Sequence, residues 1–224
     1  MLSIPLERQE IKFVNPYREK IKEYPGRLFT FEDFDADLLS LKVITTCAQG
    51  IFCELGSGSG RHLIKQAQLD PGNLYIGIEL RYKRAYRTIQ KAVNKNVDNL
   101  LVLRTNASNL EHLFSLGSLN GIYINFPDPW EKRKVRKHRL VSEAFLDVTF
   151  GLLRPGGFIS FKTDHKEYYQ SFFDLLSGDS RFCLRSQTED LYNSQYVGDN
   201  IETEFECLFR SQNLPICFLL AHKL

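Results

Sequence analysis

The sequence predicts an α/β fold in which a mostly parallel, doubly wound sheet carries helices on both faces. Three observations predict it. Short apolar runs alternate with helix-length amphipathic segments from residue 51 onward, a glycine-rich stretch joins the first run to the first helix, and 43% of the 224 residues are apolar. Apolar runs of this length are typical of strands buried on both faces, and regular alternation of strand and helix is typical of parallel crossovers.

Seven strands and five helices are expected after an N-terminal extension. The apolar runs that predict strands cover residues 51–55, 74–80, 100–104, 121–126, 158–162, 182–186 and 216–222. Helical spacing of apolar residues covers 62–69, 83–94, 108–114, 139–153 and 166–176. Pro16 and Pro25 interrupt residues 1–50, and apolar residues at 37–44 have the spacing of a support helix. We therefore expect an extension over 1–50 and one domain over 51–224.

Charge is distributed unevenly along a chain whose net charge is only +2. Residues 81–95 and 132–139 each contain six Lys or Arg and no acid. Solvated helix faces would explain one such stretch, but two of them favour a polyanionic partner.

Several classes of protein are disfavoured. The longest apolar run, 216–221, is far shorter than the roughly 20 residues of a membrane-spanning helix. The N-terminus lacks the basic and apolar segments of a secretory signal, so a cytoplasmic protein is expected. The five cysteines form no C-x-x-C pair and the histidines are scattered, so we expect reduced thiols and no metal site.

A glycine loop follows the first predicted strand, with the sequence E-L-G-S-G-S-G over 54–60. Gly56 and Gly58 allow a tight turn and a close approach of the backbone to a ligand. Glu79 ends the second strand, 19 residues after the last glycine, where a carboxylate accepts hydrogen bonds from ribose hydroxyls. Arginine stands where a dinucleotide fingerprint needs its third glycine, and Glu54 would repel a pyrophosphate. The pattern predicts S-adenosyl-L-methionine rather than NAD, with a plain turn at a strand end as the alternative.

Two further loops follow the third and fourth predicted strands. Asn106 lies where it can bond an adenine edge, although capping of the next helix is equally open. The fourth strand leads into the sequence N-F-P-D-P-W over 125–130, where two prolines restrict the backbone around Asp128. We expect the Asp128 carboxylate to face the cofactor, and Trp130 either to stack on a base or to pack in the core. The cations after this loop are suited to nucleic-acid phosphates.

These motifs, with Lys162-Thr163-Asp164 and Thr203-Glu204-Phe205-Glu206, give the chain a specific resemblance. From about residue 54 to the C-terminus it resembles the bacterial tRNA (guanine-N7-)-methyltransferase family. The resemblance implies a Rossmann-like class I methyltransferase fold and methyl transfer to N7 of a guanine in the tRNA variable loop, at position 46. It implies Asp128 as the catalytic residue. The cofactor contacts expected from the motifs are Glu54, Gly56, Gly58, Glu79, Asn106 and Asp128, and the implied substrate contacts are Lys132, Asp164, Thr203, Glu204, Phe205 and Glu206.

The sequence departs from the family pattern in two places. The family usually has Asp at Asn106, and Pro, His and Arg at Glu131, Val135 and His138, so cofactor affinity and RNA contacts are expected to differ in detail. Guanine N7 carries no proton, so Asp128 is expected to orient the base and offset charge rather than act as a base. The alternatives are a methyltransferase acting on the exocyclic amino group of adenine and a non-enzymatic RNA-binding scaffold. Monomer and homodimer both stay open.

Overall fold

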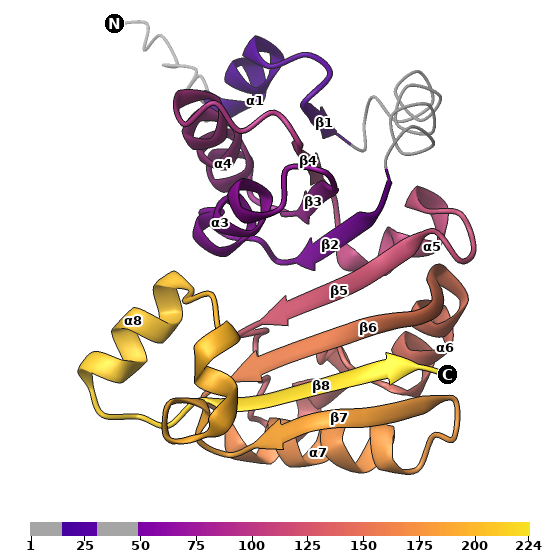
Figure 1. Cartoon of the computed structure of the whole chain (residues 1–224). Helices are drawn as coiled ribbons and strands as arrows, with labels where there is room; N and C mark the ends of the chain where they lie inside the picture. Colours follow the sequence, from indigo (N-terminus) through magenta and orange to yellow (C-terminus); the bar gives the residue numbers. More distant parts are fainter. Residues whose placement is uncertain (1–14, 31–48) are drawn as a thin grey trace, which may run out of the picture.

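The computed structural model describes residues 15–30 and 49–224. Eight strands of these residues form one sheet in the order β1-β4-β3-β2-β5-β6-β8-β7 (Figure 1). Their bounds are β1 Leu28–Thr30, β2 Ile51–Leu55, β3 Leu74–Ile78, β4 Leu100–Arg104, β5 Leu119–Asn125, β6 Leu153–Thr163, β7 Phe182–Thr188 and β8 Cys217–Lys223. Strand β8 runs antiparallel to β6 and β7, and the other neighbours pair in parallel. The predicted mostly parallel α/β sheet is confirmed.

The predicted count of seven strands is wrong, because β1 from the N-terminal extension pairs in parallel with β4. Its first two side chains enter opposite layers of the core: Leu28 packs with the cluster under α4, and Phe29 with the larger cluster on the other face. A strand of three residues is too short to produce a recognisable alternation, so its register depends on β4. The support helix predicted at 37–44 falls outside the described residues.

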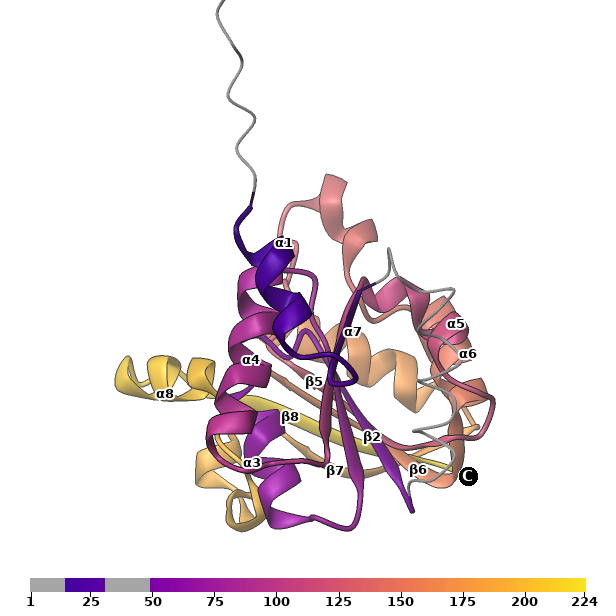
Figure 2. The same cartoon turned by 90° about the horizontal axis from the view of Figure 1, so that it is seen from above.

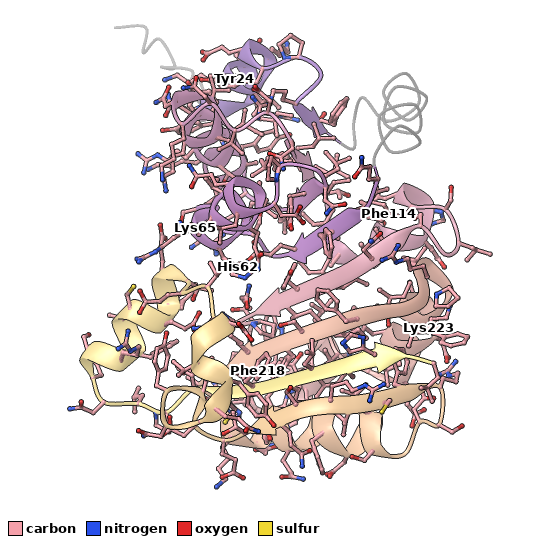
Figure 3. All side chains as sticks on the ribbon, in the orientation of Figure 1. Tyr24, His62, Lys65, Phe114, Phe218 and Lys223 are labelled. Atoms are coloured by element: carbon pink, nitrogen blue, oxygen red, sulfur yellow. The ribbon has the colours of Figure 1, made fainter. Side chains whose placement is uncertain are left out.

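Helices cover both faces of the sheet, as Figure 2 shows. On one face lie α1 (Tyr17–Lys20), α3 (Arg61–Leu69) and α4 (Tyr82–Asn94), and on the other α5 (Leu110–Leu113), α6 (Glu143–Leu152) and α7 (Lys166–Ser177). Successive strand residues point to opposite faces. In β4, Leu100 and Val102 pack toward α3 and α4, whereas Leu101 and Leu103 join the other core. Figure 3 draws the side chains on both faces of the sheet. Burial on both faces explains why the strands read as continuous apolar runs.

Several element boundaries differ from the predicted ones. Helix α6 begins at Glu143 rather than 139, because Ser142 caps it by accepting the N–H of Phe145, and a 3₁₀ helix, η4 (Arg133–His138), precedes it. Strand β6 extends back to Leu153 with a shift of register against β5. The region between β7 and β8 contains a further helix, α8 (Glu204–Ser211). No helix in the described ranges is long and apolar enough to cross a membrane.

The order in which successive strands are added to the sheet reverses between the parallel neighbours β2 and β5. From β2 the chain continues to β3 and β4 on one side, and from β5 to β6 on the other. The loops at the carboxyl ends of these parallel strands diverge at this point and leave a crevice, which is where open α/β sheets bind ligands. The glycine loop, Glu79, Asn106 and Asp128 all follow strands that end there.

Candidate active site

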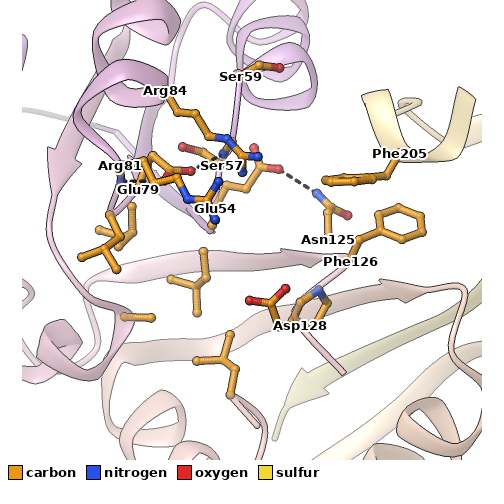
Figure 4. Close-up of a pocket in the computed structure, with 18 of the residues that line it drawn as sticks. Glu54, Ser57, Ser59, Glu79, Arg81, Arg84, Asn125, Phe126, Asp128 and Phe205 are labelled. Carbon is orange, nitrogen blue, oxygen red and sulfur yellow. Dashed lines mark hydrogen bonds between the residues drawn. The ribbon is translucent and has the colours of Figure 1, made fainter. Parts of the chain in front are cut away.

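A cleft with a volume of about 460 Å³ lies at the carboxyl edge of the sheet. The loops after β2, β3, β4 and β5 line it, together with the start of α8 (Figure 4). The cleft therefore brings together four segments that the sequence predicted separately. All six predicted cofactor residues line it: Glu54, Gly56, Gly58, Glu79, Asn106 and Asp128.

The glycine loop is held rigidly by its neighbours. Gly56 has φ 71° and Gly58 has φ 57°, a left-handed conformation that favours glycine. The N–H of Gly56 donates to the carbonyl of Ile78 at 2.9 Å, which ties the loop to the end of β3. Two side chains of α4 donate to the loop: Thr88 Oγ1 to the Gly58 carbonyl at 3.2 Å, and Lys91 Nζ to the Ser59 carbonyl at 3.1 Å. The loop is thus preformed for a ligand that approaches its backbone.

Glu79 is buried beside this loop, with 6% of its surface exposed. Its Oε2 accepts the N–H of Gly58 at 3.0 Å, and its Oε1 accepts the N–H of Arg81 at 2.8 Å. Each carboxylate oxygen has a further acceptor site, so these bonds orient Glu79 without saturating it. The two remaining sites suit a pair of neighbouring hydroxyl groups.

Glu54 is more deeply buried, with 3% of its surface exposed. Asn125 Nδ2 donates to Glu54 Oε1 at 2.8 Å (Figure 4). Oε2 has no hydrogen-bond partner among the described residues; His62 Nδ1 lies 3.3 Å away, but its direction does not make a hydrogen bond. A buried carboxylate oxygen without a hydrogen-bond partner is costly. Such an oxygen at a cleft wall fits the ammonium end of S-adenosylmethionine.

The loop after β5 carries Asp128 into the cleft. The N–H of Phe126 donates to the Lys162 carbonyl at 2.8 Å and fixes the start of the loop. Asp128 itself is exposed, and Figure 4 shows its carboxylate pointing into the cleft. Trp130 is 41% exposed and its ring lies 5.6 Å from that of His138. The core alternative for Trp130 is therefore wrong.

Asn106 has both of the surroundings that the sequence left open. Its Oδ1 accepts the N–H of Ser108 at 3.0 Å, which caps the short 3₁₀ helix before α5. The same residue is exposed and lines the cleft. Capping is confirmed, and contact with an adenine edge stays a prediction.

The first turn of α8 forms one wall of the cleft. Thr203, Glu204 and Phe205 line it. The ring of Phe205 is 44% exposed and lies 5.9 Å from that of Phe126 (Figure 4). Thr203 caps α8 by accepting the N–H of Glu206 at 3.0 Å. The exposed aromatic edge, rather than the cap, is the part available to a planar ligand.

Glu206 faces inward, fully buried. Its carboxylate accepts from Lys162 Nζ at 2.8 Å, from the Thr203 N–H at 2.8 Å and from Asn200 Nδ2 at 2.9 Å. Burial raises the pKa of Glu206, but Lys162 and these hydrogen bonds outweigh it, so the pKa lies below its ordinary value. Burial lowers the pKa of Lys162, and Glu206 opposes that change. This network fastens α8 to β6; a direct contact of Glu206 with tRNA stays a prediction.

Lys132 and Asp164 are exposed and lie outside the cleft lining. The basic loop that contains Lys132 is fastened to α7, because Arg136 pairs with Glu167 at 2.7 Å and the guanidinium of Arg139 lies 4.7 Å from the centre of the Tyr168 ring. At least two of its six cations are therefore structural. Lys132 and its exposed lysine neighbours are the ones available to phosphates.

The sequence did not single out some residues of the site. Asn125 and Lys162 stand directly before Phe126 and Thr163 in the motifs, but their partners are far away in sequence. Arg84 belongs to the basic stretch at 81–95 and also lines the cleft. In the sequence, His62 is one of several scattered histidines, and the fold places it next to Glu54.

Comparisons with known proteins agree on one family. A family model described as "Putative methyltransferase" matches residues 48–219. The tRNA (guanine-N(7)-)-methyltransferase of Bdellovibrio bacteriovorus is 36% identical over 171 residues, covering 76% of this chain and 81% of the relative. That of Mycoplasma genitalium is 38% identical, covering 76% and 83%.

Solved structures agree on the fold alone, because their sequence identities are low. The 16S rRNA methyltransferase KamB aligns with TM-score 0.61 and 16% identity, covering 83% of this chain and 93% of KamB. TrmN from Thermus thermophilus aligns with TM-score 0.56 and 18% identity, covering 84% and 48%. With the family model and the curated relatives, the chain belongs to the tRNA (guanine-N7-)-methyltransferase family.

Proposed function

We propose that this protein transfers a methyl group from S-adenosyl-L-methionine to N7 of a guanine in tRNA, and that the guanine is the one at position 46 of the variable loop. The observation that carries the proposal is the pair of buried acids, Glu54 and Glu79, across the same cleft from the Asp128 carboxylate. Membership of the family supports the target atom.

Different residues of the cleft would each contact a different part of the cofactor. S-adenosylmethionine supplies an electrophilic methyl group when it is bound. Glu54 would receive its ammonium group, Glu79 its ribose hydroxyls and Asn106 its adenine edge. Gly56 and Gly58 leave room for the backbone to approach it.

Methylation of guanine N7 makes modest chemical demands, because N7 has an in-plane lone pair and no proton to remove. The protein has to hold N7 in line with the methyl group, and such positioning can contribute up to about 7–11 kcal/mol to lowering the barrier. Phe126 and Phe205 offer exposed ring surface for stacking of the base. Asp128 can accept a hydrogen bond from the guanine edge and offset the positive charge that develops on the ring.

The remaining parts of the chain would support this reaction. Residues 51–224 would form the methyltransferase domain, and residues 1–50 an extension that contributes β1 to its sheet. Exposed cations around Lys132 hold the tRNA backbone, and the enzyme acts in the cytoplasm as a monomer or homodimer.

The experiment is incubation with labelled S-adenosylmethionine and unmodified tRNA, followed by nucleoside analysis. We expect 7-methylguanosine, and borohydride reduction with aniline cleavage should cut the tRNA at the variable-loop guanine. A tRNA with adenine at that position is the matched control. Methylated adenosine would favour the amino-methyltransferase alternative, and no methylation by a protein that also fails to bind S-adenosylhomocysteine would favour the scaffold.

A further inference from the structure

His62 and Glu54 form a buried polar pair at the wall of the cleft. His62 is 4% exposed and stands in the first turn of α3, between that helix and β5 (Figure 3). Its Nδ1 lies 3.3 Å from Glu54 Oε2. Neither atom has a hydrogen-bond partner within the described part of the chain. Two facing polar atoms that both lack a partner are unusual in a protein interior.

The surroundings of His62 favour one tautomer of its ring. The amide nitrogen of Gln66, one turn along α3, lies 3.3 Å from His62 Nε2. Because an amide N–H₂ group donates, this contact fits the tautomer in which Nε2 accepts and Nδ1 carries the ring N–H. The ring packs edge-on against Tyr123 of β5, with centroids 5.0 Å apart. Packing and the Gln66 contact therefore direct an N–H toward Glu54.

We infer that His62 is a positioning residue for the amino-acid end of the cofactor. Asn125 from β5 restrains one oxygen of Glu54, and His62 from α3 faces the other. A small rotation of either side chain aligns Nδ1–H with Oε2. The carboxylate is then held from two elements and presents its remaining acceptor sites to a ligand ammonium group. The inference rests on the proposed use of S-adenosylmethionine and adds a residue to that site.

Binding measurements on isosteric variants test the inference. His62→Leu and His62→Asn both remove the ring, but only asparagine keeps an N–H donor near the position of Nδ1. Calorimetry with S-adenosylhomocysteine should show binding weakened roughly tenfold in His62→Leu, the size of a hydrogen bond to a charged group, and about threefold or less in His62→Asn. With 5′-methylthioadenosine, which lacks the amino-acid end, the two variants should bind equally. The KM for S-adenosylmethionine should rise in His62→Leu while kcat at saturation stays within about twofold.

A measurement on the unchanged protein removes dependence on how well the variants fold. In ¹⁵N spectra of labelled histidine, His62 should carry its proton on Nδ1, and that signal should shift when S-adenosylhomocysteine is added. The exposed His112 is the internal control and should not respond. Equal affinities of the Leu and Asn variants, or an unresponsive His62 signal, overturn the inference. If the protein binds S-adenosylhomocysteine but methylates no tRNA, the proposed function fails and the role of His62 stands.

Discussion

At the scale of single residues, the acids of the cleft differ in how the fold holds them. Glu54 and Glu79 are buried and receive hydrogen bonds from the main chain or from Asn125. Asp128 stands exposed on a loop between two prolines. Buried acids are positioned when the protein folds, before any ligand arrives. Asp128 is restrained by its backbone, and its carboxylate is accessible to a base that enters the cleft.

Asp128→Asn should lower kcat about 100-fold, the effect of losing one group that stabilises developing charge. Because the amide keeps the shape of the side chain and the phosphate contacts lie elsewhere, tRNA affinity should change by less than about twofold. Single-turnover methylation and filter binding measure the two quantities. Glu111→Gln, a charge-removing change at an exposed residue outside the cleft, is the control. Equal losses of rate and of tRNA binding would contradict the assigned role.

Gly60→Ala should destabilise the protein by about 2–3 kcal/mol. Gly60 has φ 78°, and an added Cβ would clash with the fully buried side chain of Thr88. Gly156→Ala is the matched control, since Gly156 has φ 74° but no atom within 4 Å of the added carbon. The free energy of unfolding of Gly156→Ala should fall by only about 1 kcal/mol, from backbone strain. Urea unfolding compares them, and equal losses would show that the clash with Thr88 does not matter.

At the scale of elements, the buried residue by which α8 is joined to the sheet is an acid, Glu206, whereas Phe205 and Phe209 pack on Phe126 at the surface. Glu206 and Lys162 are both buried, and Phe205 and Leu208 on the same helix are about half exposed. Breaking a buried pair leaves one charge without compensation, which costs about 3–5 kcal/mol. The placement of Phe205 at the cleft wall therefore depends on Glu206.

Glu206→Gln should lower the free energy of unfolding by about 3 kcal/mol at pH 7, since it leaves the Lys162 ammonium without its carboxylate. The KM for tRNA should rise as well, because α8 carries Phe205. Chemical unfolding and steady-state kinetics measure these effects. Glu204→Gln, on the same helix but exposed and 3.6 Å from Lys91, is the control and should lose less than about 1 kcal/mol. A stable Glu206→Gln protein would contradict the role of this network.

The same carboxylate gives stability a dependence on acid pH. The pKa of Glu206 is lower in the folded protein than its ordinary value of 4.5, so the unfolded chain binds more protons in this range. Its contribution to stability is therefore complete above about pH 4.5 and is lost as the pH falls through the folded pKa. The free energy of unfolding, measured from pH 7 to pH 3, should decline more steeply in the wild type than in Glu206→Gln. Parallel curves would assign the decline to other acids.

At the scale of the whole molecule, a nearly neutral protein presents cations at one edge of the sheet. The formal net charge is +2, yet the loop over 132–139 holds six Lys or Arg beside the cleft. Arg136 and Arg139 fasten this loop to α7, whereas Lys132, Lys134 and Lys137 are exposed. Local charge, rather than net charge, directs a polyanion to the site.

Replacing Lys132, Lys134 and Lys137 together by alanine should weaken tRNA binding and lower the slope of log affinity against log salt by roughly two to three, one unit for each lost phosphate contact. Binding to S-adenosylhomocysteine should stay unchanged. Arg154→Ala is the control for removal of an exposed cation, because Arg154 lies near the start of β6, at the end of the strand far from the cleft. An unchanged salt dependence would remove this loop from the tRNA surface.

The features of this protein that depend on local pattern could be predicted from the amino-acid sequence. Apolar runs and helical spacing identified β2 to β8 and α3 to α7. The Asp128 loop with its basic tail and the T-x-F-E sequence at 203–206, together with the glycine loop, identified the family. A strand or helix buries residues at a fixed period, and a tight loop needs glycine or proline. These features can therefore be recognised from a few neighbouring residues. The predicted helix boundaries were wrong where a capping residue sets the start of the helix, as Ser142 does for α6.

The contacts between distant residues became known only from the folded structure. It added β1 beside β4, turned Glu206 inward onto Lys162, and brought His62 and Asn125 to the two oxygens of Glu54. No local pattern specifies these contacts. The Lys162–Glu206, Glu54–Asn125 and β1–β4 contacts join residues 44 or more positions apart, and the His62–Glu54 contact depends on how α3 lies on the sheet. Whether an acid binds a ligand or fastens a helix is therefore settled by packing, since burial and the donors nearby determine what its carboxylate can still accept.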